Sequence, residues 1–307
     1  MKERLHLQLV GEDGRRELKK HVSFSELRLF YECNWKWVLL KVQNKSVVDT
    51  SFQMEFGKAV HSGMEILYSP GGTAELATAH ASKLYEQSLS VLDIAHPTDL
   101  AEAIRIKNCI SGFYRDCLIC PDLQGITTLK SELQLYEPIA RTDGLDIKFK
   151  GFIDIVFVKK LKRKTVIYIA DFKTCQWGWP AKKLQDPEVL AQLLLYKHFF
   201  CKMTGADPKN VSAAFILLKK KPKVISAKGV EPVVYDIVVD VEKISAGPKS
   251  TQRALDYLQD AITAMHSGVY ERNRDACTRG WTDSVTKEER SVSCPFFDTI
   301  SCPSMSV

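Results

Sequence analysis

Apolar positions in the first 125 residues recur at intervals of three and four, which is the period of an α-helix. Residues 52–68 show it in one stripe, made of Phe56, Val60, Met64, Leu67 and Tyr68. The same period predicts helices over residues 74–91 and 97–120. An earlier helix is expected over residues 23–37, because Ser23 can cap it and Glu26 completes a capping-box arrangement. The chain therefore opens with a mainly helical region.

From about residue 126 the apolar positions alternate or form short runs, which is typical of strands. The expected strands are 127–137, 147–158, 165–172, 211–218 and 233–239. A helix over residues 187–201 follows the third strand, and a last helix over residues 250–266 precedes a polar tail with cysteines. This order predicts an α/β fold.

Three further segments carry local signals. Residues 5–14 alternate and then contain Gly-Glu-Asp-Gly, which predicts a small hairpin. Residues 159–164 and 219–223 are rich in lysine and are expected to be hairpin tips, with phosphate contact as the alternative.

Composition narrows the class of protein. The chain has 307 residues, 45% of them hydrophobic, and a formal net charge of +6, so a polyanionic partner is compatible with it. We find no apolar leader at the N-terminus and no run of membrane-spanning length, so we expect a soluble, cytoplasmic protein without a membrane partner. Nine cysteines, an odd number, argue against a complete disulfide framework.

The candidate chemistry lies at the end of the apolar run Val166–Thr174. Asp171 and Lys173 are two residues apart, so on a strand they project from one face. The preceding strand places Asp154 inside an apolar run, where its charge needs a partner. If the strands are neighbours, both carboxylates can converge on one Mg²⁺ or Mn²⁺. The alternative for Asp171 and Lys173 alone is an ordinary ion pair.

In order along the chain, these motifs resemble the PD-(D/E)XK nuclease superfamily. Gly151-Phe152-Ile153-Asp154 and Asp171-Phe172-Lys173 are similar to its core motifs, and Gln192 to Tyr196 resembles the Gln-x-x-x-Tyr motif of its RecB-like branch. Gly57 to His61 is similar to the helical segment in which that branch carries a metal-binding histidine. The resemblance implies a restriction-endonuclease-like mixed sheet flanked by helices.

The same resemblance implies roles for the matching residues. His61, Asp154, Asp171 and the backbone carbonyl of Phe172 would hold the metal, and Lys173 would act at the attacking water. The catalytic set would further include Gln192 and Tyr196, which lie on one helix face and would steady the substrate. Glu132 matches an acid on the first core strand and is a secondary candidate.

Four cysteines resemble the ligand set of a 4Fe-4S cluster in some RecB-like nucleases, AddB and the CRISPR-associated exonucleases among them. They are Cys33, Cys277, Cys294 and Cys302. The spacing departs from that family, because position 291, where a Cys-x-x-Cys pair would begin, is serine. Loss of the cluster from a degenerate tail is the alternative.

The expected organisation is a hairpin and helical region over residues 1–125, a nuclease core over 126–245 and a helix with a cysteine-containing tail over 246–307.

The expected function is metal-dependent hydrolysis of DNA, with an exonuclease on single-stranded ends favoured. A structure-selective or flap endonuclease and a non-catalytic DNA-binding module are the alternatives. The chain has no helicase motif, so a helicase or recombination protein is an expected partner. The pattern leaves the oligomeric state open.

Two tryptophans follow the expected strand that carries Asp171 and Lys173. Trp177 and Trp179 could stack on unpaired bases or could cover the core, and the sequence does not separate these alternatives.

Overall fold

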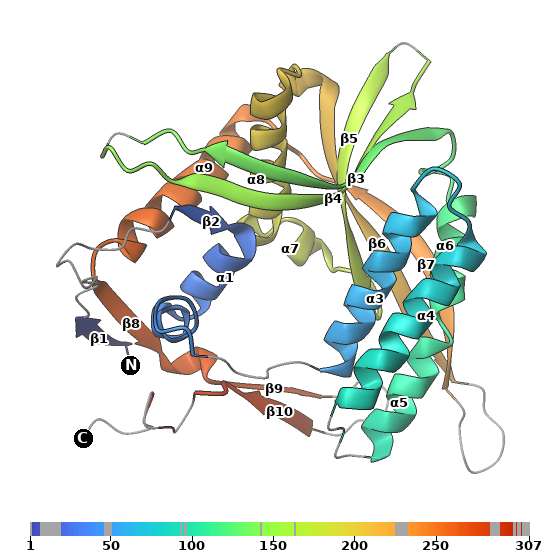
Figure 1. Ribbon diagram of the computed structural model, residues 1–307, viewed down its shortest axis with the longest axis horizontal. Helices are drawn as coiled ribbons and strands as arrows, with labels where there is room; N and C mark the ends of the chain where they lie inside the picture. The colour runs from blue at the N-terminus through green and yellow to red at the C-terminus, as the bar shows by residue number, and fades with distance from the viewer. Residues whose placement is uncertain are drawn as a thin grey trace. The chain divides into compact units, whose positions relative to one another are not determined.

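The computed structural model describes residues 2–6, 20–45, 51–92, 94, 97–141, 143–162, 164–224, 233–282, 289–296, 299 and 302. Figure 1 shows the elements. In chain order they are β1 (Lys2–His6), β2 (His21–Ser23), α1 (Phe24–Glu32), α2 (Asn34–Trp37), the π-helical turn η1 (Val38–Val42), α3 (Phe52–Leu67), α4 (Ala74–Val91), α5 (Pro97–Lys107), α6 (Ile110–Ile119), β3 (Ile126–Pro138), β4 (Lys148–Lys160), β5 (Thr165–Cys175), α7 (Ala181–Leu184), α8 (Pro187–Thr204), the 3₁₀ turn η2 (Pro208–Asn210), β6 (Val211–Val224), β7 (Val233–Lys243), α9 (Pro248–Met265), β8 (Val269–Asn273), the 3₁₀ turn η3 (Arg274–Ala276), β9 (Thr278–Thr282) and β10 (Glu289–Ser293).

The main sheet has the strand order β2-β4-β5-β6-β7, and β3 pairs with β4. β5 runs antiparallel to β4 and parallel to β6, and β7 is antiparallel to β6. The crossover between the two parallel strands contains α8, as parallel pairing requires a long connection. This mixed sheet flanked by helices confirms the expected α/β, restriction-endonuclease-like fold class.

The chain divides into two compact units. Unit 1 contains residues 1–49, 136–151 and 255–307, and unit 2 contains residues 50–135 and 152–254. Because each unit draws on separate stretches of chain, this division does not test the consecutive functional regions expected from the sequence, which remain a prediction.

Unit 2 contains most of the sheet and its helical cover. Helices α3 to α6 pack on one face, where Phe56 and Phe113 join Phe157, Phe172 and Ile216 in one apolar core. Helix α8 contacts β5 and β6 (Figure 1), and the alternation of side chains along a strand assigns it to the opposite face. The residues of β5 therefore divide between two environments, with Phe172 toward α3 and its neighbours Asp171 and Lys173 toward α8.

Unit 1 combines short strands with α1 and most of α9. β1 pairs antiparallel with β8, β9 with β10, and β2 with the start of β4. Tyr31 of α1 stacks on Tyr257 of α9 at 4.0 Å between ring centroids and donates a hydrogen bond to its backbone carbonyl at 2.8 Å. These contacts join helices that are far apart in the sequence.

Local capping agrees with the sequence in several places. Ser23 accepts a hydrogen bond from the Glu26 amide at 3.3 Å, which confirms the expected start of α1. Thr73 caps α4 in the same way, and the bounds of that helix are those predicted. Helix α8 begins at Pro187 after an Asp186 cap and ends at Thr204, before the C-cap Gly205, whose φ of 71° is the left-handed conformation that glycine adopts without strain.

Three predicted elements were wrong. The helix expected over 97–120 is two helices, because the amides of Asn108 and Cys109 bond three residues back and end α5. The first helix ends at Glu32, and Cys33 takes an extended conformation before α2. The lysine-rich segment 219–223 is not a hairpin tip but lies inside β6, paired with β7.

Lys159 and Lys160 lie in β4 and pair with the start of β5, and just beyond them the Leu161 amide donates to the Lys164 carbonyl at 2.8 Å, as expected for the end of a hairpin. The hairpin expected at residues 5–14 lies mostly outside the described residues, and β1, which contains its first residues, pairs with β8. No described helix is long and apolar enough to cross a membrane.

Candidate active site

The candidate site lies in unit 2, where β4 and β5 separate. Their ladder ends at the pair Ile155 and Ala170. One more step in that register would place Asp154 opposite Asp171, but the strands are no longer paired there. The Phe172 amide instead donates to Asp154 Oδ2 at 2.7 Å. A side chain thus replaces the backbone acceptor, and the gap between the strands receives two carboxylates on one face.

Helix α8 holds Asp171 from the same face. Gln192 Nε2 donates to Asp171 Oδ1 at 2.6 Å, and it lies 3.4 Å from the hydroxyl oxygen of the buried Tyr196. Gln192 and Tyr196 are one turn apart on the helix, so the spacing that the sequence shows brings both to one place. The amide therefore fixes the orientation of a carboxylate that is only 2% exposed.

Lys173 lies beside the other oxygen of the same carboxylate. Its Nζ is 2.5 Å from Asp171 Oδ2, and the lysine side chain is 30% exposed. That oxygen is buried and makes no hydrogen bond among the described residues, so its contact with Lys173 is an ion pair without hydrogen-bond geometry. A buried carboxylate oxygen without a hydrogen bond is costly, and a cation is the group that would compensate it.

His61 reaches the site from α3. Its Nδ1 lies 3.4 Å from Asp154 Oδ2, and its ring meets the Phe172 ring edge-on at 6.1 Å between centroids. Gly57, one turn earlier on α3, lies beside β5, since a Cβ there would be in ordinary van der Waals contact with Thr174 Oγ1 at 3.4 Å. Burial lowers the pKa of His61, which favours the neutral ring that can bind a metal.

Burial raises the pKa of Asp154 well above its ordinary value, and the neighbouring Asp171 raises it further, while Lys173 and the Phe172 amide oppose the rise. Two like charges in a low-dielectric site disfavour each other's ionisation. Displacing the proton of Asp154 is therefore part of binding any cation here.

Two further acids border this group. Burial raises the pKa of Glu132, as do the nearby Glu65 and Asp171. Glu132 has a φ of 48°, and residues 131–133 are all half-buried, so the alternation of β3 is interrupted there as in a β-bulge. Sequence reasoning named Glu132 but missed Glu65, although its position one turn after His61 on α3 was a usable signal.

The donor set suits a hard divalent cation. Adjacent ligands of an octahedral ion with bonds of about 2.1 Å lie about 3.0 Å apart, close to the 3.4 Å between His61 Nδ1 and Asp154 Oδ2. Within the described residues, however, no three His, Cys, Asp or Glu side chains are already arranged to hold a metal ion. The reason is that both carboxylates are turned toward nitrogen atoms. Asp154 faces the Phe172 amide, and Asp171 faces the side chains of Gln192 and Lys173.

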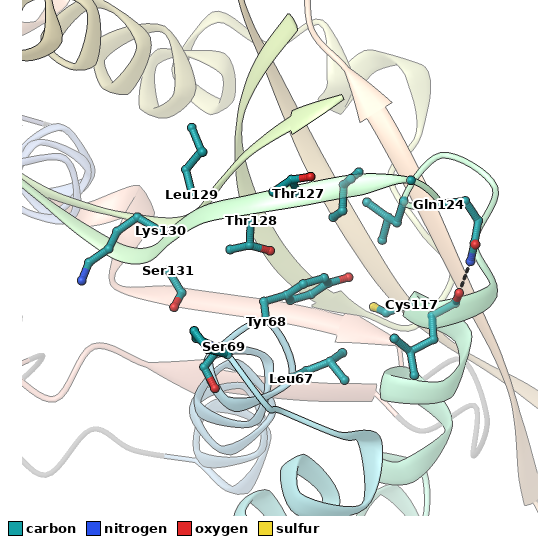
Figure 2. A pocket seen from close by; sticks show the side chains of 15 residues that line it. Leu67, Tyr68, Ser69, Cys117, Gln124, Thr127, Thr128, Leu129, Lys130 and Ser131 are labelled. Carbon is teal, nitrogen blue, oxygen red and sulfur yellow. Dashed lines mark hydrogen bonds between the residues drawn. The ribbon is translucent and has the colours of Figure 1, made fainter. Parts of the chain in front are cut away.

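A cavity of about 830 Å³ lies on the α3 side of β5. Figure 2 shows Tyr68 inside it, between the end of α3 and the start of β3, with Thr128 and Ser131 on the β3 wall. The Tyr68 ring stacks on Phe172 at 6.0 Å between centroids, and its buried hydroxyl makes no hydrogen bond among the described residues. Because Phe172 and Asp171 face opposite sides of β5, we assign this cavity no part in the chemistry.

The four cysteines expected to bind an iron-sulfur cluster all belong to unit 1. The backbone of Asn273 contacts two of them: its N–H donates to Cys33 Sγ at 3.5 Å, and its carbonyl accepts from Cys277 Sγ at 3.6 Å. The backbone N–H of Cys294 donates to the backbone carbonyl of Cys277 at 2.6 Å. Cys302 bridges to Thr299. Three of the four are thus linked through short contacts, but the described thiols do not form a ready ligand set, and the cluster stays a prediction.

Two comparisons with known proteins find a match. The model of the PD-(D/E)XK nuclease superfamily matches residues 21–280. A candidate exonuclease from Eubacterium rectale has a similar crystal structure, with a TM-score of 0.50 and 14% identity over 84% of this chain and 86% of that one. A search of curated proteins finds no match. Because the family match covers most of the chain and includes every residue of the candidate site, the chain belongs to the PD-(D/E)XK nuclease superfamily.

Proposed function

We propose that this chain is a Mg²⁺- or Mn²⁺-dependent deoxyribonuclease of the RecB-like type that degrades DNA from single-stranded ends. The observation that carries the proposal is the gathering of Asp154, Asp171 and Lys173 at the point where β4 and β5 separate. Membership of a nuclease superfamily supports hydrolysis of phosphodiester bonds. The exonuclease preference comes from the resemblance to the RecB-like branch.

The residues of the site would have different roles. Asp154, Asp171, His61 and the Phe172 carbonyl would hold the cation, which when bound supplies Lewis acidity and stabilises the leaving oxygen. Gln192 keeps one oxygen of Asp171 engaged, so that the buried Oδ2 is the one presented to a cation. Tyr196 in turn contacts Gln192 at 3.4 Å and restrains its amide.

Lys173 is suited to the attacking water and the phosphate. Its ammonium is held at the carboxylate by the 2.5 Å ion pair, while almost a third of its side chain is exposed. It can therefore donate a hydrogen bond toward solvent without leaving the site. A positive group fixed beside the phosphate stabilises the charge that develops during hydrolysis.

The test compares DNA circles with linear strands. Parent protein in Mn²⁺ should release mononucleotides or short products from a linear single strand and leave a single-stranded circle intact. Cutting of the circle would replace the exonuclease with the endonuclease alternative. An absence of cleavage of any DNA, with Mg²⁺ or Mn²⁺, would leave the non-catalytic DNA-binding module. We also propose that duplex ends are opened by a partner helicase, so purified protein should degrade blunt duplexes much more slowly than single strands.

A 4Fe-4S cluster on Cys33, Cys277, Cys294 and Cys302 is a separate part of the proposal. The contacts that Asn273 makes with both Cys33 and Cys277 support it. Thiolates are the usual ligands of such clusters. Protein purified without oxygen should contain about four irons and absorb visible light, and Cys277→Ser should lose both. Colourless, iron-free protein would contradict the cluster and leave the nuclease proposal untouched.

A further inference from the structure

The turn after the catalytic strand separates two tryptophans that the sequence could not distinguish. Trp179 packs against Phe215, with 4.8 Å between ring centroids. Trp177 is 54% exposed. Gly178 lies between them with a φ of 97°, a conformation that L-residues rarely adopt, and it lets the turn direct the two rings differently. Trp179 is therefore a packing residue, and Trp177 is presented to solvent.

The register of β5 and β6 shows which face the turn covers. Phe215, on which Trp179 rests, pairs with Asp171, and Lys219 pairs with Cys175. A Cβ on Gly178 would come within 3.0 Å of Lys219 Cδ. Paired residues of neighbouring strands share a face. The turn therefore lies against the same face of the sheet that carries Asp171 and Lys173.

Trp177 is also close to the site along the chain. It lies four positions after Lys173, so their Cα atoms are at most about 14 Å apart. Two lysines of α7 are nearby: Lys182 and Lys183 are exposed, and Lys183 Nζ lies 4.2 Å from the Trp179 ring centroid. Lys219 is neutralised by its ion pair with Asp240. An exposed indole beside surface lysines is complementary to a base and its phosphate.

From this geometry we propose that Trp177 stacks on an unpaired base of the DNA strand whose phosphate lies at Asp171 and Lys173, and that α7 contacts the adjoining backbone. The inference rests on the proposed nuclease function and adds the residue that selects a single strand. A paired base in a duplex is already stacked on both sides, so an indole gains such a contact only from an unstacked base. Trp179, packed on Phe215, has no part in this contact.

The experiment measures binding without cleavage. Tryptophan fluorescence is followed while a short oligothymidylate is added to protein in EDTA, for the parent protein and for Trp177→Ala, Trp177→Phe and Trp179→Phe. The same proteins are titrated with a duplex dumbbell whose ends are closed by non-nucleotide linkers, so that it offers neither a free strand end nor an unpaired base. Thermal melting of each variant shows that it is folded. Cleavage of a linear single strand in Mn²⁺ then gives KM and kcat.

Parent protein should show quenching by the oligonucleotide, and Trp177→Ala should lose most of it and bind about 5- to 150-fold more weakly, the range found when stacking aromatics are removed. Trp177→Phe should bind with intermediate strength, while Trp179→Phe keeps the quenching. Binding of the dumbbell should change little in Trp177→Ala, and the loss on single strands should fall mainly on KM.

Equal affinity of parent and Trp177→Ala for the oligonucleotide would overturn the inference, as would an equal loss on oligonucleotide and dumbbell. If parent protein cleaves DNA in either case, the proposed function stands and only the role of Trp177 fails. Parent protein that neither binds nor cleaves DNA would overturn both.

Discussion

Asp171→Asn should abolish the stabilisation of the protein by Mn²⁺. The substitution keeps the shape of the side chain and an oxygen that can accept from Gln192, but it removes the charge at the buried Oδ2. A cation that binds only the native state stabilises it by about 2.7 kcal/mol when its free concentration is 100 times the dissociation constant. This linkage gives the size of the expected effect.

The structure converts that free energy into a melting shift. Unit 2, which contains the site, has about 190 residues. At about 2.1 cal/mol/K per residue, its entropy of unfolding is about 0.4 kcal/mol/K. The parent protein should therefore melt about 7 °C higher with saturating Mn²⁺ than with EDTA, as measured by calorimetry or dye fluorescence. Asp171→Asn should shift by less than about 1 °C under the same conditions.

Asp116→Asn is the matched control, because Asp116 is a half-buried carboxylate of α6 outside the site. It should keep the full shift of the parent protein. The reasoning would be refuted if Asp171→Asn retained the shift, or if Asp116→Asn lost it equally, since either result would place the bound cation elsewhere.

Three other predictions follow from the same contacts. Gln192→Leu should lower kcat by about 10- to 100-fold, because it removes a hydrogen bond that, when made to a charged group, is worth about 1.5–3 kcal/mol. Gln192→Glu tests the role of the amide. An unchanged kcat in Gln192→Leu would contradict the prediction. Tyr68→Phe should leave the free energy of unfolding unchanged or slightly higher, because the hydroxyl is buried without a hydrogen bond among the described residues. If urea unfolding showed that the free energy of unfolding falls by more than about 1 kcal/mol, the hydroxyl would have a partner in the cavity. Apparent Mn²⁺ affinity should rise with pH through the raised pKa of Asp154, because the cation must displace its proton. Since the pKa of Asp154 in the folded protein exceeds the ordinary value of 3.8, its contribution to stability without metal should fall as pH rises from 3.8 to the folded-state pKa. A calorimetric titration in which Mn²⁺ affinity does not change with pH would contradict the assignment.

Much of the fold could be predicted because local signals and tertiary contacts agree. The apolar stripe of α3 is the face that packs in the core, and α4 has the predicted bounds, 74–91, after a Thr73 cap. The break between α5 and α6 could not be predicted, because the apolar period continues through Asn108 while the backbone there turns more tightly. The periodicity of side chains does not report such a change.

The lysine-rich segment of β6 shows the opposite problem. Lysines around Pro222 have the composition of a turn, yet pairing with β7 extends the strand through them to Val224. Lys219 is buried beside Asp240, and Lys220 lies 5.3 Å from the centroid of the Tyr235 ring. Partners on another strand decide the structure of this segment, and they are not visible in its own composition.

The sequence could predict which residues form the candidate site, but not how they are arranged. Motif spacing named Asp154, Asp171, Lys173 and His61. It could not show that the β4–β5 ladder ends one residue before both carboxylates, or that the Phe172 amide bonds to Asp154 there. Nor could it show the left-handed backbone of Glu132, because such a conformation depends on the surrounding strands.

The central claim is that the Asp171 and Lys173 pair performs hydrolysis. Its most direct test is single-turnover cleavage of an end-labelled linear single strand in Mn²⁺ by parent protein and by Lys173→Met, with Lys209→Met, an exposed lysine of η2, as the matched control. We predict that Lys173→Met cleaves at least about 100-fold more slowly, the usual loss when a group that stabilises transition-state charge is removed, and that Lys209→Met cleaves like the parent protein. Cleavage by Lys173→Met within about threefold of the parent rate, far less than such a loss, would contradict the claim.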